Sequence, residues 1–213
     1  MILIGQYDSP FVRRVAIAMK RYGLAYEHRP WSVWADAEAL AQVSPLRRVP
    51  VLVLDDGMGL VESASILDAL DDLVGEERAL LPRRGPVRRD GLRVASLATG
   101  VADKAVSLFY EKVLRPVDHE SAVWVERCEA QIRDTLGALE RDRAGRASAW
   151  WLGDHLTHAD IAVGCMLRFV GEAHPGLQRA VPPALEAHAA QCEALPEFQE
   201  IRQPLRVTLA AAS

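Results

Sequence analysis

Residues 1–31, MILIGQYDSPFVRRVAIAMKRYGLAYEHRPW, carry the signals of a strand, a helix and a second strand in succession. The apolar run at residues 2–4 predicts the first strand, and Pro10 to Tyr22 predicts a helix that ends before Gly23. Tyr26 to Trp31 predicts the second strand. Two parallel strands need a crossover connection between them, so this order indicates a βαβ unit.

A hairpin and a further helix follow this unit. Residues 51–54 and 59–61 read as strands on either side of Asp-Asp-Gly-Met, which contains the Asp-Gly signal of a tight turn. Ser63 to Val74 returns to a helical period, and Gly75 is placed to end that helix. The order βαβαββα, with a short helix before the hairpin, resembles an α/β thioredoxin-like domain, a resemblance that by itself implies no chemistry.

After about residue 80 the pattern is helical throughout. Residues 79–86, with a proline at each end of their Pro-Arg-Arg-Gly-Pro run, form the predicted linker between a domain at 1–78 and an all-α domain at 87–213. Apolar residues recur there at three- and four-residue steps. The helices that this periodicity and the first-turn prolines predict are 87–113, 121–139, and three that begin near Thr157, Pro182 and Pro196.

Composition and charge narrow the classes of function. The net charge of -4 provides no basic field that would gather phosphates, so nucleic acid is not an expected partner. Neither a signal peptide nor an apolar run of membrane-spanning length is found, so we expect a cytoplasmic protein without a membrane partner. The three cysteines, Cys128, Cys165 and Cys192, are widely spaced, which predicts reduced, buried thiols rather than disulfides.

Ser9 is the first candidate functional residue, and it has two interpretations. Serine followed by proline at the start of a helix is the usual N-cap and N1 pair, in which the serine oxygen satisfies a backbone amide. Alternatively, its hydroxyl donates a hydrogen bond to a thiolate at the positive end of the helix dipole. Lowering a thiol pKa by about two units takes roughly 2.7 kcal/mol, which a hydroxyl and a helix end can supply together.

Three short segments form a recognisable set: Tyr7-Asp8-Ser9-Pro10-Phe11, Arg48-Val49-Pro50-Val51-Leu52 and Glu62-Ser63-Ala64-Ser65-Ile66. With the two-domain layout, they resemble the cytosolic glutathione S-transferase family in its serine-type, bacterial-like form. The resemblance implies that Ser9, which precedes a Pro-aromatic pair, stabilises the glutathione thiolate. Tyr7 is the rival, because the tyrosine-type classes use a tyrosine at the end of the first strand.

The same resemblance implies how the rest of glutathione binds. It implies a cis Val49–Pro50 peptide bond, beside which the backbone pairs with the cysteinyl part of the peptide as an added strand would. Arg48 is expected near the glycyl carboxylate. Ser63, interpreted as an N-cap, and the first amides of its helix are expected to bind the γ-glutamyl carboxylate, with Glu62 near other polar groups. The preceding run Ser44-Pro45-Leu46-Arg47 departs from the family pattern of Asn-Pro, Gly and Lys.

The expected reaction is conjugation of the glutathione thiolate to a small hydrophobic electrophile, as in detoxification. Phe11, Trp34, Phe109 and Tyr110 are expected to line the electrophile pocket between the domains. Two alternatives stay open: a glutathione-binding or dimeric interaction protein without turnover, and a glutathione-dependent isomerase. The isomerase is disfavoured because that class has a Ser-Ser-Cys run where this chain has Ser-Pro-Phe.

Glutathione is expected as co-substrate, and no metal is expected. His155 and His158 stand near each other, but neither an HExxH motif nor a cysteine pair accompanies them. Thr157-His158-Ala159-Asp160 predicts a capping box, which is a folding signal for the helix that follows. The family resemblance also implies a homodimer.

Overall fold

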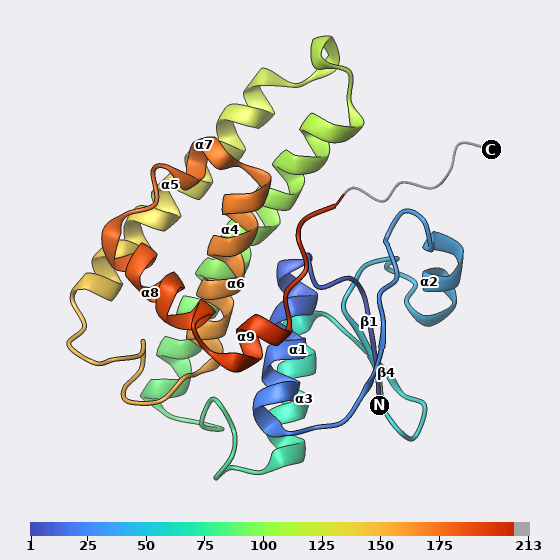
Figure 1. Ribbon diagram of the computed structural model, residues 1–213, viewed down its shortest axis with the longest axis vertical. Coiled ribbons are helices and arrows are strands. Elements are labelled where there is room, and N and C mark those ends of the chain that lie inside the picture. Colours follow the sequence, from blue (N-terminus) through green and yellow to red (C-terminus); the bar gives the residue numbers. More distant parts are fainter. Residues whose placement is uncertain (207–213) are drawn as a thin grey trace. The chain divides into compact units, whose positions relative to one another are not determined.

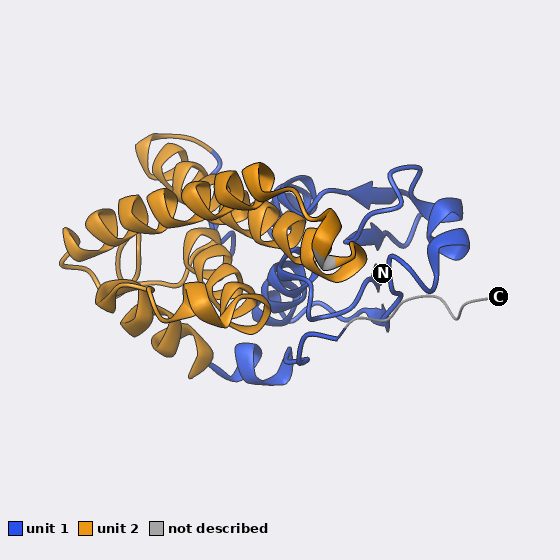
Figure 2. Cartoon of the chain, turned by 90° about the horizontal axis from the view of Figure 1, so that it is seen from above, with its two compact units in different colours: residues 1–83, 195–213 blue, residues 84–194 orange. Residues whose placement is uncertain are grey.

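The computed structural model describes residues 1–206, and the chain forms two compact units (Figure 2). The first unit joins residues 1–83 to the segment that begins at Leu195, and the second holds residues 84–194. The sequence places the segment after residue 194 with the helical domain, whereas the structure packs it with the first unit. The reason is Arg13, whose buried guanidinium donates hydrogen bonds to two backbone carbonyls of that segment.

The first unit is built around a four-stranded sheet. Its elements are β1 (Ile2–Ile4), α1 (Pro10–Tyr22), β2 (Glu27–Arg29), α2 (Ala37–Val43), β3 (Val51–Val53), β4 (Gly59–Val61), α3 (Ser63–Val74) and α9 (Pro196–Glu200). The strand order is β2-β1-β3-β4, with β1 parallel to β2 and antiparallel to β3, and β3 antiparallel to β4. This is the thioredoxin-like arrangement that the sequence predicts.

The helix α1 begins and ends at the residues that its sequence signals indicate. The Ser9 side chain accepts a hydrogen bond from the Val12 amide, and Pro10 occupies the first helical position. Gly23 ends the helix with φ of 67°, a left-handed conformation that glycine adopts at little cost. The first cap fixes the start of α1 at the candidate residue Ser9, and the second fixes its end.

Helices cover both faces of the sheet. α1 and α3 lie on one face and α2 lies on the other (Figure 1). Side chains of a strand alternate between the faces, and on the α2 face the fully buried Ile4, Val51 and Leu40 pack in one cluster. Each such side chain contributes about 1.5–3 kcal/mol on burial, so this end of the sheet is firmly packed.

The second unit is helical throughout. Its elements are α4 (Pro86–Leu114), the 3-10 helix η1 (Val117–His119), α5 (Ala122–Ala144), α6 (His158–Ala173), α7 (Pro175–Gln178) and α8 (Pro183–Glu193). α6 is buried along most of its length and begins with the predicted capping box, in which the Asp160 carboxylate accepts from the Thr157 amide at 2.8 Å. The fold as a whole is therefore a thioredoxin-like domain with a helical domain, as predicted.

Four charged residues join the start of α4 to the end of α5. Arg93 donates to Asp90 at 2.8 Å and to Asp142 at 2.6 Å. Arg146 donates to the same two carboxylates, at 2.8 Å and 2.9 Å. Trp151 adds an indole N–H to Asp142 at 3.2 Å. Burial alone would raise the pKa of Asp142, but the hydrogen bonds from Arg93, Arg146 and Trp151 lower it below its usual value.

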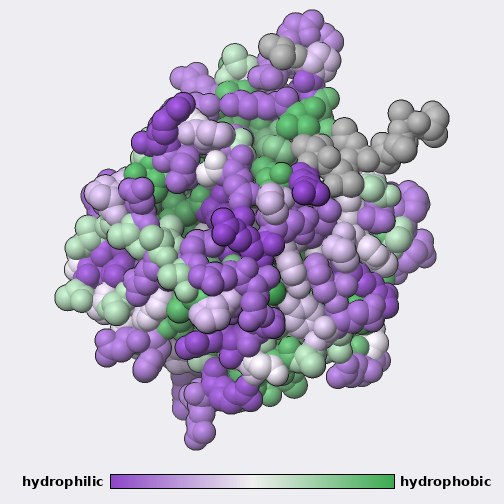
Figure 3. Space-filling view, in the orientation of Figure 1, coloured by the Kyte–Doolittle hydropathy of each residue, from purple (hydrophilic) through white to green (hydrophobic). Residues whose placement is uncertain are grey.

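The structure also differs from the sequence prediction in several local details. β2 is shorter than the predicted strand, α7 and η1 were not anticipated, and Ser63 is the first residue of α3 rather than its N-cap. Glu62 takes the N-cap position instead, with φ of 65°. Among residues 1–206, no helix combines the length and hydrophobicity that a bilayer crossing requires. The face seen in Figure 3 is mostly hydrophilic, with hydrophobic residues in smaller areas.

Candidate active site

The three segments singled out in the sequence meet the sheet at the same end. Ile4 of β1 pairs with Val51 of β3, and Val51 pairs in turn with Val61 of β4. The loop to α1 follows Ile4, the Val49–Pro50 pair precedes Val51, and α3 follows directly after Val61 and Glu62. One row of paired residues therefore brings the three segments to a common edge.

Ser9 lies at the N-terminus of α1, where the helix dipole is positive. Its Oγ accepts a hydrogen bond from the Val12 amide at 3.4 Å, and its carbonyl accepts from the Arg13 amide at 2.9 Å. Among residues 1–206, no acceptor for the Ser9 O–H is found. A hydroxyl has one proton to donate and two lone pairs, so Ser9 is able to cap the helix and to donate to an anion at once.

Tyr7 is held against the β2 side of the sheet. Its ring stacks on that of His28, with centroids 3.8 Å apart and planes inclined by 2°. Its hydroxyl lies 2.9 Å from the Tyr26 hydroxyl. Burial, and next the hydrogen bond with Tyr26, raise the pKa of Tyr7 well above its usual value. Tyr7 is thus a neutral phenol whose hydroxyl already has a partner.

The Val49–Pro50 peptide bond is cis, as the sequence led us to expect. Gly5, just after β1, lets Val49 approach the first turn of α1. A Cβ at Gly5 would lie 2.8 Å from the Val49 Cβ and 2.5 Å from a methyl carbon of Val12, and Gly5 has φ of 126°. Both facts require glycine at this position. Gly5 therefore packs the Val49 segment against the start of α1.

Arg48 and Glu62 lie on the rim of this edge. Arg48 Nη1 is 3.7 Å from Glu62 Oε1, and both side chains are more than half exposed. Exposed pairs of this kind contribute little to stability, so exchanging this contact for one with a ligand costs little. Arg47 and Glu62 are the two non-glycine residues with positive φ among those the structure describes. Such conformations gather at binding sites more often than elsewhere.

The N-terminus of α3 has no side-chain cap. Ser63 is buried, and its Oγ accepts from Arg14 Nη1 at 3.5 Å, which turns the hydroxyl toward α1. The first amides of the helix, at Ser63, Ala64 and Ser65, have no intrahelical partner because they belong to the first turn. Together with the nearby Arg14 guanidinium, they favour an anion at this helix end.

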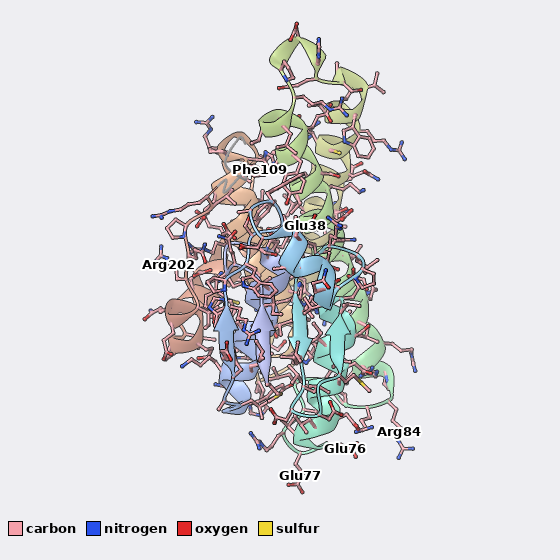
Figure 4. All side chains as sticks on the ribbon, turned by 90° about the vertical axis from the view of Figure 1, so that its right-hand side faces the viewer. Glu38, Glu76, Glu77, Arg84, Phe109 and Arg202 are labelled. Carbon is pink, nitrogen blue, oxygen red and sulfur yellow. The ribbon has the colours of Figure 1, made fainter. Side chains whose placement is uncertain are left out.

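The four residues predicted to line an electrophile pocket fall into two pairs. Phe11 lies in the first turn of α1 and Trp34 lies before α2, where its side chain is 39% exposed. Phe109, labelled in Figure 4, and Tyr110 are neighbours on α4, with ring centroids 6.0 Å apart. The first pair belongs to the first unit and the second pair to the second unit. That they share one pocket stays a prediction.

Residues 1–206 contain no group of His, Cys, Asp or Glu side chains arranged to hold a metal ion. The three cysteines are buried in the second unit, and none of them forms a disulfide with a described residue. His158 is also buried, in the first turn of α6, whereas His155 is exposed. The groups that the structure places at this edge of the sheet are hydroxyls, backbone amides and charged side chains.

Comparison with known proteins identifies the family of this chain. The model of the glutathione S-transferase N-terminal domain matches residues 3–78, and that of the C-terminal domain matches residues 122–191. The uncharacterized GST-like protein YibF of Escherichia coli K12 is 30% identical over 170 residues, which are 80% of this chain and 82% of that protein. The chain belongs to the glutathione S-transferase family. Glutathione S-transferase U6 of Arabidopsis thaliana is 29% identical over 78% of this chain and 70% of its own.

Solved structures of glutathione S-transferases are similar to this chain along nearly its whole length. One from Methylobacterium radiotolerans, in complex with glutathione sulfonate, has a TM-score of 0.90 and 30% identity, covering 100% of this chain and 99% of its own. A glutathione transferase family member from Pseudomonas fluorescens Pf-5, with bound glutathione, has a TM-score of 0.83 and 33% identity, covering 96% of this chain and 99% of its own.

Several residues that shape this candidate site were not predicted. Gly5 had a signal, because a glycine directly after a strand often marks a close backbone approach. Arg14 is a charged residue in an otherwise apolar helix face, and the sequence predicts that such a side chain is exposed to solvent. Tyr26 directly precedes β2 and His28 lies within it, and neither belongs to a polar sequence motif. Their contacts with Tyr7 arise from the parallel pairing of β1 with β2.

Proposed function

We propose that this protein is a cytoplasmic glutathione transferase of the serine type, which conjugates the glutathione thiolate to a small hydrophobic electrophile. The observation that carries the proposal is the row of paired residues Ile4, Val51 and Val61. It brings a helix-capping serine, an extended backbone segment and an uncapped helix N-terminus to one edge. Those are the three kinds of group that a γ-glutamyl peptide with a reactive thiol requires.

The proposed role of Ser9 rests on its place at the helix end and on its hydroxyl proton, for which no acceptor is found within residues 1–206. A hydrogen bond from a hydroxyl to a thiolate is charge-assisted, and the helix dipole adds to it. The thiolate is the nucleophile, so lowering the thiol pKa raises the reactive fraction at neutral pH. Tyr7 is less suited to this role because its hydroxyl is engaged with Tyr26.

The other groups would hold the peptide. The backbone of Val49 would pair with the cysteinyl part, with Pro50 keeping that segment extended toward β3. Arg48 would pair with the glycyl carboxylate, and Glu62 would meet polar groups of the γ-glutamyl part. The amides that begin α3, including that of Ser63, would bind the γ-glutamyl carboxylate. The glutathione complexes of the similar solved structures support this use of the same fold.

The electrophile would be apolar, since Phe11 and Trp34 offer aromatic surface in the first unit and Phe109 and Tyr110 offer it in the second. Conjugation to such compounds is a detoxification reaction. The buried cysteines are thiols rather than disulfides, which fits a protein of a reducing compartment such as the cytoplasm.

A glutathione affinity measurement combined with a panel of electrophiles tests the proposal. Calorimetric titration with glutathione is expected to show saturable binding, and turnover is expected with at least one apolar electrophile. Binding without turnover on any compound, under conditions where a known transferase is active, would favour an interaction protein instead. Isomerisation without conjugation would favour the isomerase.

We also propose a homodimer. Large apolar side chains remain exposed on both units, for example Leu73 of α3 at 59% and Leu92 of α4 at 43%. A stable isologous interface buries on the order of 1,600 Å² or more. Sedimentation velocity at micromolar concentration is expected to give a particle of twice the chain mass, and a monomer at that concentration would contradict the proposal.

A further inference from the structure

The C-terminal segment after α9 is anchored to α1 by a buried arginine. The Arg13 side chain is 1% exposed, and its guanidinium lies 5.3 Å from the centre of the Phe198 ring. Its Nε donates to the Ile201 carbonyl at 2.8 Å and its Nη2 to the Phe198 carbonyl at 2.9 Å. Because these carbonyls end a helix, a cation there is favourable. The anchor stands one turn after Ser9 on the same helix.

From this anchor the chain runs to the loop that carries Ser9 (Figure 1). The Gln203 side chain accepts a hydrogen bond from the Tyr7 amide, with 3.1 Å between nitrogen and Oε1. The Arg206 amide donates to the Asp8 carboxylate at 3.2 Å. Residues 201–206, which we call the C-terminal strap, therefore contact both residues that precede Ser9. Nearly two hundred positions separate the partners in sequence.

The loop that the strap contacts is short and tightly connected to Ser9. The Ser9 amide donates to the Gln6 carbonyl at 3.2 Å, so residues 6–9 form a single turn with Tyr7 and Asp8 at its centre. Tyr7 is fixed on its side-chain end by His28 and Tyr26. Gln203 fixes its backbone end. A change in the Tyr7 backbone would consequently be passed directly to Ser9.

We infer that Gln203 is a positioning residue for Ser9, acting through the Tyr7 amide. This inference rests on the proposed function, in which the Ser9 hydroxyl donates to the glutathione thiolate. Gln203 acts on the backbone of the loop and touches neither the thiol nor the hydroxyl. Its loss is expected to misdirect the hydroxyl, because catalysis by a positioned group is sensitive to displacements of about 1 Å.

The inference predicts a specific pattern of effects. The peptide is proposed to bind through Arg48, the Val49 segment and the start of α3, whereas Gln203 accepts its hydrogen bond from the Tyr7 amide. Glutathione affinity should therefore be retained when Gln203 is changed. The pKa of the bound thiol should rise, and turnover at neutral pH should fall with it.

The test compares Gln203→Met with Arg202→Met in the full chain. Methionine matches the length of glutamine but accepts no strong hydrogen bond. Arg202 is the neighbouring residue, is exposed, and projects outward in Figure 4, so its replacement is the matched control. The thiolate absorbance of bound glutathione is followed against pH, together with kcat, glutathione affinity and thermal unfolding.

Gln203→Met is expected to lower kcat about threefold to tenfold, the equivalent of one ordinary hydrogen bond. The apparent thiol pKa is expected to rise by about half a unit to one unit. Glutathione affinity and the unfolding midpoint should match those of Arg202→Met. Unchanged kcat and thiol pKa would overturn the inference, as would a loss of turnover that merely follows unfolding or weaker glutathione binding.

Ser9→Ala, measured in parallel, separates this inference from the proposed function. If Ser9→Ala raises the thiol pKa and Gln203→Met does not, the strap has no positioning role while the role of Ser9 stands. If Ser9→Ala leaves the thiol pKa unchanged, the proposed role of Ser9 fails, and the inference fails with it.

Discussion

The hydroxyl oxygens of Tyr7 and Tyr26 lie 2.9 Å apart, and this contact is the reason we propose Ser9 rather than Tyr7 for thiolate stabilisation. A phenol has one proton to donate, so Tyr7 has none left for a thiolate when it is the donor in this hydrogen bond. The Ser9 hydroxyl keeps its proton free of any acceptor found among residues 1–206. The sequence alone could not separate them, because Tyr26 becomes a neighbour of Tyr7 only once the sheet has formed.

Replacing Ser9 by alanine is expected to lower conjugation activity by about one to three powers of ten, the usual loss when one donor to a developing anion is removed. Tyr7→Phe keeps the stacked ring and is expected to change activity far less. Steady-state kinetics at saturating glutathione measure both. If Tyr7→Phe produced the large loss and Ser9→Ala did not, the serine-type assignment would be wrong.

The helix cap requires a control in that experiment. Ser9→Ala removes the cap on α1 at a cost of about 1 kcal/mol, whereas glycine at an N-cap costs a few tenths. Ser9→Gly therefore removes the hydroxyl with little loss of helix stability. Equal activity losses in the two variants assign the effect to the hydroxyl, and a loss confined to Ser9→Ala assigns it to helix stability.

Arg48→Met is expected to weaken glutathione binding about tenfold, because one charge-assisted hydrogen bond to a carboxylate is lost. kcat at saturating glutathione should change little. Arg47→Met is the control, since Arg47 is the adjacent residue and pairs with Glu38 at 3.0 Å. Calorimetric titration measures both affinities, and equal affinities in the two variants would remove Arg48 from the site.

Much of the fold could be predicted because its signals are local. Ser9-Pro10 and Gly23 mark the ends of α1, and the Asp-Gly turn marks the hairpin, so these boundaries follow from the residues themselves. The short second strand and the position of Ser63 were predicted less well. Glu62 takes the N-cap position and has a positive φ, a backbone conformation that a glutamate in the sequence does not predict.

The candidate site was predictable as three segments but not as an assembly. Their meeting depends on strand register, which pairs Ile4 with Val51 and Val51 with Val61. Register is set by packing of the whole sheet rather than by any one motif. The position of the C-terminal strap could not be predicted either, because Arg13 and Ile201 are far apart in the sequence and come into contact only when the chain folds.

His188 in the second unit is expected to make stability sensitive to acid. Its Nε2 is 3.5 Å from Asp160 Oδ1 and 3.7 Å from Cys192 Sγ. Burial lowers the pKa of His188 to about 4, with Asp160 opposing the shift and Arg143 adding to it. The unfolded state binds the proton at a pKa near 6.5, so folded stability falls as pH falls from about 6.5 to 4.

Urea unfolding at several pH values within this window measures that slope. His188→Gln removes the titrating group and is expected to flatten the dependence. His155→Gln is the control, because His155 is exposed and its replacement should leave the slope unchanged. A wild-type slope that persists in His188→Gln would show that other groups cause the acid sensitivity.

Arg146→Met is expected to lower the free energy of unfolding by about 1–3 kcal/mol, because it leaves Asp90 and Asp142 partly buried with one fewer donor each. Arg141→Met, at an exposed position near the end of α5, is the control and should stay within about 0.5 kcal/mol of the wild type.

The network formed by Arg93, Arg146, Asp90 and Asp142 also predicts how the Arg146 effect depends on pH. Burial opposes the shift, yet hydrogen bonds from both arginines lower the pKa of Asp90 and of Asp142. A carboxyl whose folded pKa is lowered stabilises the fold above its unfolded pKa of about 3.9, and that stabilisation is lost as pH falls further. The difference between Arg146→Met and wild type should therefore be largest near neutral pH and shrink below about pH 4. Urea unfolding near neutral pH and below about pH 4 measures this difference in stability. A difference that is the same at the two pH values would assign the loss of stability to packing of the Arg146 side chain rather than to its charge.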